Sequence, residues 1–139
     1  MLRIKFNSEI LKYMSLFESL TRTKLKDCFF DSKDLLVFVV NENELGKAIG
    51  KNGDNIRRIS TAFRKRVKLV EYSPHLIKFV SNLLYPLKPT EITEEGGVIT
   101  VTGADTKTKG LLIGRSGQNL RNNEEIVKRY FEISEIKVV

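Results

Sequence analysis

Apolar residues in the first half of the chain recur first at helical spacing and then at strand spacing. A stripe of residues three or four apart follows the potential capping pair Asn7-Ser8 and predicts one helix face, at Ile10, Met14, Phe17 and Leu20. Two short apolar runs separated by Ser32-Lys33-Asp34 predict two strands joined by a turn. The elements expected in this half are a helix at 8–22, strands at 28–31 and 35–40, helices at 42–49 and 54–66, and a strand at 67–72.

The same cycle of elements restarts after residue 72. Ser73-Pro74 has the pattern of a helix cap followed by proline in the first turn, and the apolar stripe of this helix ends before Pro86. The expected elements are this helix, strands at 87–93 and 98–102, helices at 105–112 and 118–130, and a strand at 133–138. Each half therefore has the order αββααβ, which predicts an α/β (α+β) fold with a boundary near 72–73.

Composition narrows the class of protein. The chain has 139 residues, of which 41% are hydrophobic and 29% charged, as in a globular protein with a modest core. Its longest apolar run, Leu35 to Val40, is far shorter than the ~20 residues of a membrane-spanning helix. The first fifteen residues lack the apolar block of a signal peptide, so we expect a cytoplasmic protein that does not bind membranes.

Metal and disulfide chemistry is not expected, because the chain has one Cys and one His. Cys28 lies in the apolar run Cys28-Phe29-Phe30 and is interpreted as a buried structural thiol. His75 follows Ser73-Pro74 and is interpreted as a surface residue in a first helical turn. The sequence therefore predicts no cofactor and no catalytic triad.

The net charge of +7 suits a polyanionic partner. Much of it lies in residues 47–68, where eight basic residues accompany the single acid Asp54. Such a run alone is equally consistent with a solvated helix face.

An internal repeat adds a more specific signal. Residues 46–58 (GKAIGKNGDNIRR) and 110–122 (GLLIGRSGQNLRN) share six identities at an offset of 64, and each copy lies at the same place in its own cycle of elements. We interpret this as a duplication.

The repeated core I-G-x-x-G predicts two helices that meet in a short turn without bulky side chains. Gly50 would end one helix with a left-handed φ, and Gly53 would open the next. A phosphate could then approach the exposed N–H groups and the positive end of the second helix, with Lys51 or Arg115 adding charge. The alternative is a corner that uses glycine for geometry alone.

The segments Gly50-Lys51-Asn52-Gly53 and Gly114-Arg115-Ser116-Gly117 resemble the GXXG loops of KH domains, which grip about four nucleotides of single-stranded RNA. The αββααβ order resembles the type II KH arrangement. Two such domains in tandem, over 1–72 and 73–139, resemble the archaeal NusA-like transcription factors, and the resemblance covers essentially the whole chain. It implies that each domain has a three-stranded mixed sheet.

The resemblance implies an RNA-binding role for the loops, for an apolar groove beside each loop, and for the arginines that follow. The implied residues are Ile49, Gly50, Lys51, Asn52, Gly53, Ile56, Arg57 and Arg58 in the first half, and Ile113, Gly114, Arg115, Ser116, Gly117, Leu120 and Arg121 in the second. The four groove residues could also be ordinary core. Because 122–125 (NNEE) is less basic than the matching segment of the first half, we expect the first loop to bind phosphate more strongly.

An enzyme is not expected. A P-loop needs G-x-x-x-x-G-K-[ST], whereas both copies here have three residues between their glycines. The expected function is a single-stranded RNA-binding factor of transcription termination or antitermination, acting as a monomer, with RNA polymerase or ribosomal components as candidate protein partners. The alternative is an adaptor in ribosome assembly or RNA processing that works mainly through protein contacts.

Overall fold

The computed structural model describes residues 6–139; the first five residues of the expected first domain lie outside the described residues. The chain divides into two compact units, one ending at Ser73 and the other beginning at Pro74. Each unit is described by itself below. Among the described residues, no helix is long and apolar enough to cross a bilayer.

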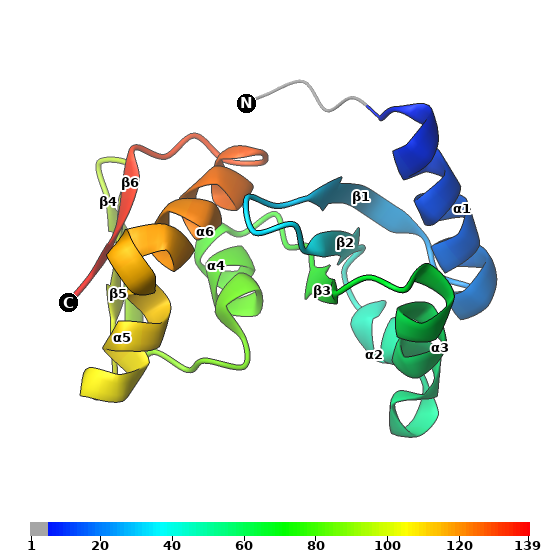
Figure 1. The fold of residues 1–139 in the computed structure, drawn as a ribbon. Coiled ribbons are helices and arrows are strands. Elements are labelled where there is room, and N and C mark those ends of the chain that lie inside the picture. Colours follow the sequence, from blue (N-terminus) through cyan, green and yellow to red (C-terminus); the bar gives the residue numbers. More distant parts are fainter. Residues whose placement is uncertain (1–5) are drawn as a thin grey trace. The chain divides into compact units, whose positions relative to one another are not determined.

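The first unit contains three helices, one 3₁₀ turn and three strands (Figure 1). In chain order they are α1 (Ser8–Thr21), β1 (Leu25–Phe30), β2 (Leu36–Val40), α2 (Leu45–Ile49), η1 (Lys51–Gly53), α3 (Asp54–Phe63) and β3 (Val67–Glu71). The sheet order is β1-β2-β3, in which β1 and β2 are antiparallel and β2 and β3 are parallel. The sheet is therefore mixed, as expected.

The helices of the first unit pack through an apolar core against the sheet. The ring of Phe17 on α1 stacks on that of Phe38 on β2, with 4.4 Å between centroids. The predicted stripe of α1 is partly correct, because Ile10 and Phe17 are buried whereas Met14 and Leu20 are half-buried. The core residues are Ile10, Phe17, Cys28, Leu36, Phe38, Val40, Ala48, Ile59 and Phe63. Cys28 is thus a buried thiol, as its sequence context indicates.

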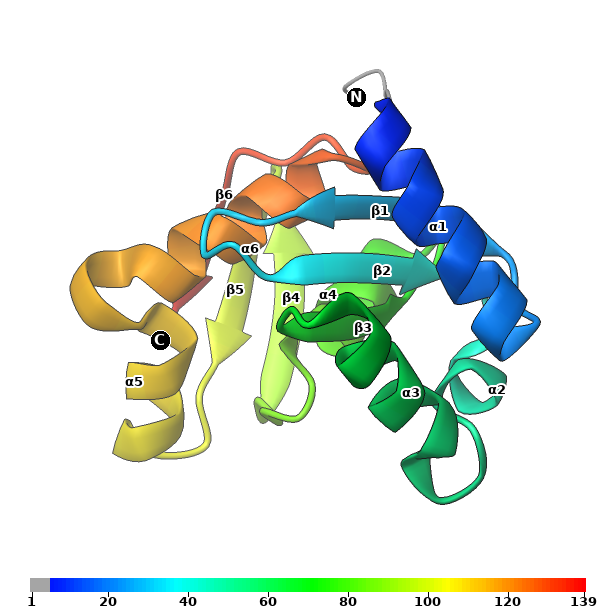
Figure 2. The same cartoon turned by 45° about the vertical axis from the view of Figure 1, so that its right-hand side comes forward.

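The second unit repeats the same order of elements. They are α4 (Leu76–Leu84), β4 (Glu91–Glu95), β5 (Val98–Thr102), α5 (Thr106–Ile113), η2 (Arg115–Gly117), α6 (Gln118–Lys128) and β6 (Glu135–Val138). The sheet order is β4-β5-β6, with β4 and β5 antiparallel and β5 and β6 parallel. Figure 2 shows that in each unit the two helices after the hairpin meet at a projecting loop.

Several predicted boundaries are wrong. The first strand begins at Leu25 instead of Cys28, and the helix predicted to reach 66 ends at Phe63, where Arg64 takes a left-handed φ of 52°. The segment 87–90 is not strand: the Leu87 N–H donates to the Leu84 carbonyl, and Pro89 has no N–H for a strand ladder.

The predicted Ser73-Pro74 helix cap is also wrong. The N-cap of α4 is His75, which is exposed and has no side-chain capping bond, and the helix begins at Leu76. The Tyr72 N–H still donates to the Val40 carbonyl at 2.8 Å, so the chain remains extended beyond β3 and Ser73 lies too early to cap.

Candidate nucleic-acid interface

The first Gly-rich loop has a defined backbone between α2 and α3. Gly50 ends α2 with φ 80° and ψ 170°, and Gly53 precedes α3 with φ 73° and ψ 19°. Between them Asn52 adopts a left-handed conformation, with φ 55° and ψ 29°. The predicted positive φ of Gly50 is correct, but its ψ is extended. Only glycine populates that region readily.

The second loop reproduces this backbone with different residues. Gly114 has φ 75° and ψ 174°, Ser116 has φ 55° and ψ 27°, and Gly117 has φ 73° and ψ 14°. The two glycines of each loop are joined in the same way, by an N–H···O bond of 3.1 Å from the second glycine to the first. The duplicated motif therefore specifies one conformation, within a few degrees, on two different pairs of intervening residues, Lys51-Asn52 and Arg115-Ser116.

Close packing as well as φ requires glycine at the first position of each loop. A Cβ on Gly50 would lie 2.8 Å from Cγ of Asn55, and one on Gly114 would lie 2.5 Å from Cγ of Asn119. Such contacts are far inside van der Waals separation. Any other residue would have to displace the asparagine side chain and, in the first loop, the backbone of Asn55 as well.

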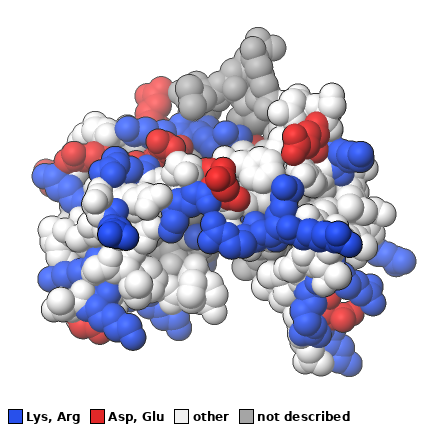
Figure 3. All heavy atoms as spheres, in the orientation of Figure 1, with Lys and Arg blue, Asp and Glu red and all other residues white. Residues whose placement is uncertain are grey.

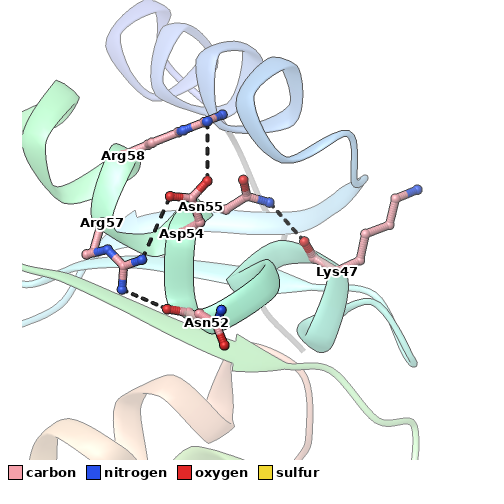
Figure 4. A network of polar contacts seen from close by, with 6 residues as sticks. All are labelled: Lys47, Asn52, Asp54, Asn55, Arg57 and Arg58. Carbon is pink, nitrogen blue, oxygen red and sulfur yellow. Dashed lines mark hydrogen bonds and ion pairs between the residues drawn. The ribbon is translucent and has the colours of Figure 1, made fainter.

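The two asparagines brace the loops. Asn55 Nδ2 donates to the Lys47 carbonyl at 3.1 Å, and Asn119 Nδ2 donates to the Leu111 carbonyl at 2.8 Å (Figure 4 shows the first pair). Each bond ties the second helix of the pair to the end of the first. Sequence comparison gives the two asparagines as identities in the repeat, but it assigns them no role.

Arg57 stabilises the first loop through a hydrogen bond to the loop backbone. Its Nη1 donates to the Asn52 carbonyl at 2.7 Å, and its Nη2 lies 3.8 Å from Asp54 (Figure 4). In the second loop, Nη1 of Arg121 lies 2.9 Å from where a Cβ of Gly117 would be, so this side chain also covers its loop.

Arg58 contacts the same carboxylate as Arg57. It forms an ion pair of 3.2 Å with Asp54 and lines a hollow together with Leu20 of α1. Both side chains of this pair are more than half exposed, so the pair contributes little stability. Arg58 therefore shares Asp54 and this hollow with Arg57, and its contact with RNA stays a prediction.

The four predicted groove residues are not fully buried. Ile49, Ile56 and Leu120 are half-buried, and Ile113 is 37% exposed. They are not part of the fully buried core, and their apolar atoms beside the loops are accessible. Sequence reasoning missed Leu111, which is 47% exposed on α5.

The net charge close to the second loop is as large as the net charge close to the first. Residues 45–58 hold four cations and one anion, whereas 109–122 hold three cations and no anion. Glu124, expected to weaken the second loop, accepts the Ile136 N–H at 2.8 Å and so faces β6. It lies about 10 Å along α6 from Gly117. Both loops stand at the positive end of a helix, and each carries an exposed cation, Lys51 or Arg115.

The residues described by the structure hold no group of three or more His, Cys, Asp or Glu side chains able to bind a metal ion. The loop geometry instead suits an anion, since backbone N–H groups, a helix N-terminus and a cation converge there.

Comparisons with known proteins agree with this class of fold. The KH domain family model matches residues 12–84, from α1 to the end of α4. A probable transcription termination protein NusA of Methanococcus vannielii is 31% identical, over 99% of this chain and 81% of that protein. A protein of the same name from Halobacterium salinarum is also 31% identical, over 97% of this chain and 98% of the relative.

A solved structure shows the same similarity at the level of the fold. The crystal structure of APE1850 has a TM-score of 0.75 and 29% identity, covering 96% of this chain and all of that one. The chain is a KH-domain protein. It belongs to the archaeal NusA-like family.

Proposed function

We propose that the chain is a tandem type II KH protein, with domains over 1–72 and 73–139, that binds single-stranded RNA as a transcription factor. The observation that carries the proposal is the duplicated loop. Two segments with different central residues adopt one glycine-dependent backbone, each at the N-terminus of a helix of ten or more residues. A corner needed only for chain reversal would not require an exposed cation in both copies.

The proposed roles follow from the side chains. Backbone N–H groups of both loops, with Lys51 and Arg115, bind phosphates. The half-exposed apolar residues next to the loops receive bases, because an unpaired base gains by leaving water against an apolar wall. Arg57 and Arg121 act partly by holding the loops in shape, as the 2.7 Å bond of Arg57 to the Asn52 carbonyl indicates.

The process proposed is transcription termination or antitermination in the cytoplasm. Its support is the name shared by the relatives, probable transcription termination protein NusA. In this proposal the chain acts as a monomer that is not an enzyme, and RNA polymerase is its candidate protein partner.

The test is the affinity of the whole chain for fluorescently labelled RNA across a salt titration. A single strand should bind at least about tenfold more tightly than the same sequence as a duplex, because a narrow loop-and-groove site accepts splayed bases only. Equal affinities would mean that the basic surface attracts RNA only by charge. Absence of RNA binding at low salt would favour the adaptor in ribosome assembly or RNA processing.

A further inference from the structure

The basic run of residues 47–68 is not one surface in the folded protein. Helix α3 separates it into cations near the first loop and a second group beyond the C-terminal end of the helix. We call this second group, together with Lys33 from outside the run, the far-end cluster. Lys33 lies in the β1–β2 turn, Arg64, Lys65 and Arg66 lie in the α3–β3 link, and Lys68 lies in β3. Figure 3 shows Lys and Arg side chains gathered over β3 and this link. Ten helical residues span about 15 Å, which separates the cluster from the loop.

Hydrogen bonds hold the turn and the link side by side. Arg66 Nη2 donates to the Lys33 carbonyl at 2.9 Å, and the Leu36 N–H donates to the Arg66 carbonyl at 2.9 Å. The backbone that carries the cations is therefore ordered.

An aromatic ring lies within the cluster. Phe30, the last residue of β1, is 38% exposed, and Nζ of Lys65 lies 5.6 Å from its ring centroid. The rings of Tyr13 and Phe30 make an edge contact with 6.1 Å between centroids, and the part of Phe30 that stays exposed is available to a base. An exposed ring among cations is the arrangement by which proteins stack bases of a single strand.

The nearby acids do not cancel this charge. Asp31 Oδ1 accepts the N–H groups of Lys33 and Leu35, at 2.8 and 2.9 Å, so it serves the turn. With Asp34, two anions face five cations. Burial, together with Lys33, lowers the pKa of Lys68 although Asp31 raises it, so the positive charge of Lys68 is held at a cost.

The second unit has the same order of elements, so it shows whether this fold requires a cluster of cations at these positions. Its β4–β5 turn is Gly96-Gly97, and its α6–β6 link, 129–134, has one cation and one acid. The same architecture therefore forms without such a cluster. Apart from Arg66, whose side chain holds the link to the turn, the cations of the cluster need an explanation other than folding.

We infer that the far-end cluster is a second contact for the single-stranded RNA held by the first loop, with cations on phosphates and a base stacked on Phe30. This inference rests on the proposed function. A strand of about four nucleotides would fill the loop site alone. A longer strand would reach the other end of α3 and gain affinity there.

The experiment compares RNAs of four and about twelve nucleotides on the full chain, measured by fluorescence anisotropy at several salt concentrations. The cluster variant is Lys33→Gln, Arg64→Gln, Lys65→Gln, which spares the structural bond of Arg66. Its affinity for the longer RNA should fall at least about tenfold, and its log K against log salt slope should flatten by about 2, or ~0.7 for each lost phosphate contact. Its affinity for the four-nucleotide RNA should change less than about twofold.

Two further variants control for charge and for stacking. Lys78→Gln, Lys107→Gln, Lys128→Gln removes the same charge from exposed positions of the second unit and should leave the length dependence intact. Phe30→Leu keeps all charges and should cost at least about fivefold on the longer RNA alone. Circular dichroism and thermal unfolding check that each variant folds.

The outcomes separate this inference from the proposed function. Loss on the longer RNA from the cluster variant, but not from its charge control, supports the inference. If substitutions in both loops abolish binding while the cluster variant binds both RNAs like the wild type, the inference is wrong and the proposed function stands. If no RNA binds even at low salt, both are wrong. An equal loss of affinity for both RNAs would mean that the cluster attracts RNA only through the general positive field of the protein, and so would an equal loss in the charge-control variant. Either result would overturn the inference of a second contact.

Discussion

Charge reversal in the two Gly-rich loops offers a matched test of how each binds RNA. Lys51→Asp, Asn52→Asp and Arg115→Asp, Ser116→Asp each change the charge of one loop by three units. Asn52 and Ser116 have the same φ of 55°, a left-handed conformation that aspartate tolerates better than most residues. Both variants should therefore fold, and their effects can be compared directly.

The expected loss of affinity for RNA can be calculated from the exposure of the loops to solvent. They are exposed, so two unit charges about 6–8 Å apart interact by roughly 0.5–0.7 kcal/mol in a water-like dielectric. Three units of charge against one phosphate then cost about 1.5–2 kcal/mol, or roughly 10–30-fold in affinity. Lost N–H contacts add to this.

Disabling one loop leaves the affinity of the other, so the pair of variants ranks the two sites. The local charge of the loops is similar, and on a four-nucleotide RNA the two residual affinities should agree within about threefold. On an RNA of about twelve nucleotides the first site should be the tighter one, because the strand reaches Arg64 and Lys65. Anisotropy titrations at low salt, where screening is weakest, measure both.

A first site weaker than the second on the longer RNA would refute this reasoning. It would mean that contacts in the apolar groove outweigh the field of the basic run. A loss below about threefold when all four substitutions are combined in one chain would instead show that phosphates do not approach the loops.

Three further predictions concern stability. Gly50→Ala should destabilise the protein by at least about 1–3 kcal/mol in urea unfolding, because Gly50 has a positive φ and its Cβ would lie 2.8 Å from Asn55. Gly46→Ala is the control and should be neutral or slightly stabilising, because the space around Gly46 is open. Equal effects of the two substitutions would contradict the loop geometry. Asp105 caps α5, and the Thr108 backbone and side-chain hydrogen bonds lower its pKa, so its contribution is present above pH 3.8 and is lost as the pH falls through its lowered pKa. The gap in unfolding free energy between wild type and Asp105→Asn should therefore shrink in acid; a constant gap would disprove this. Burial lowers the pKa of Lys68, so the unfolding free energy of the wild type should rise as the pH goes from that lowered pKa to 10.5. The stability that Lys68→Met gains at pH 7 should therefore diminish over the same range of pH. A gain in stability that does not depend on pH would contradict the lowered pKa of Lys68.

Much of the fold could be predicted from local signals. Helix α1 has its side-chain cap, Asn7, bonded to the Ile10 N–H at 2.8 Å, and its apolar spacing is visible in the sequence. The parallel pairing of β2 with β3 follows from the crossover through two helices between them. The sequence alone also identified the duplicated loops, because glycine is required wherever φ is positive and backbones approach closely.

Tertiary contacts decided the rest. The sequence offers Ser73 as a cap, but continuation of the β3 ladder to Tyr72 keeps the chain extended, and no local propensity encodes that pairing. The bracing of each loop by Asn55 and Asn119 depends on the carbonyl that the preceding helix presents eight residues earlier in the chain. The division of one basic run into two surfaces depends on where α3 ends and on the turn that meets its link. Residue spacing specifies local conformation, whereas the distance between groups from different elements is fixed only when those elements pack.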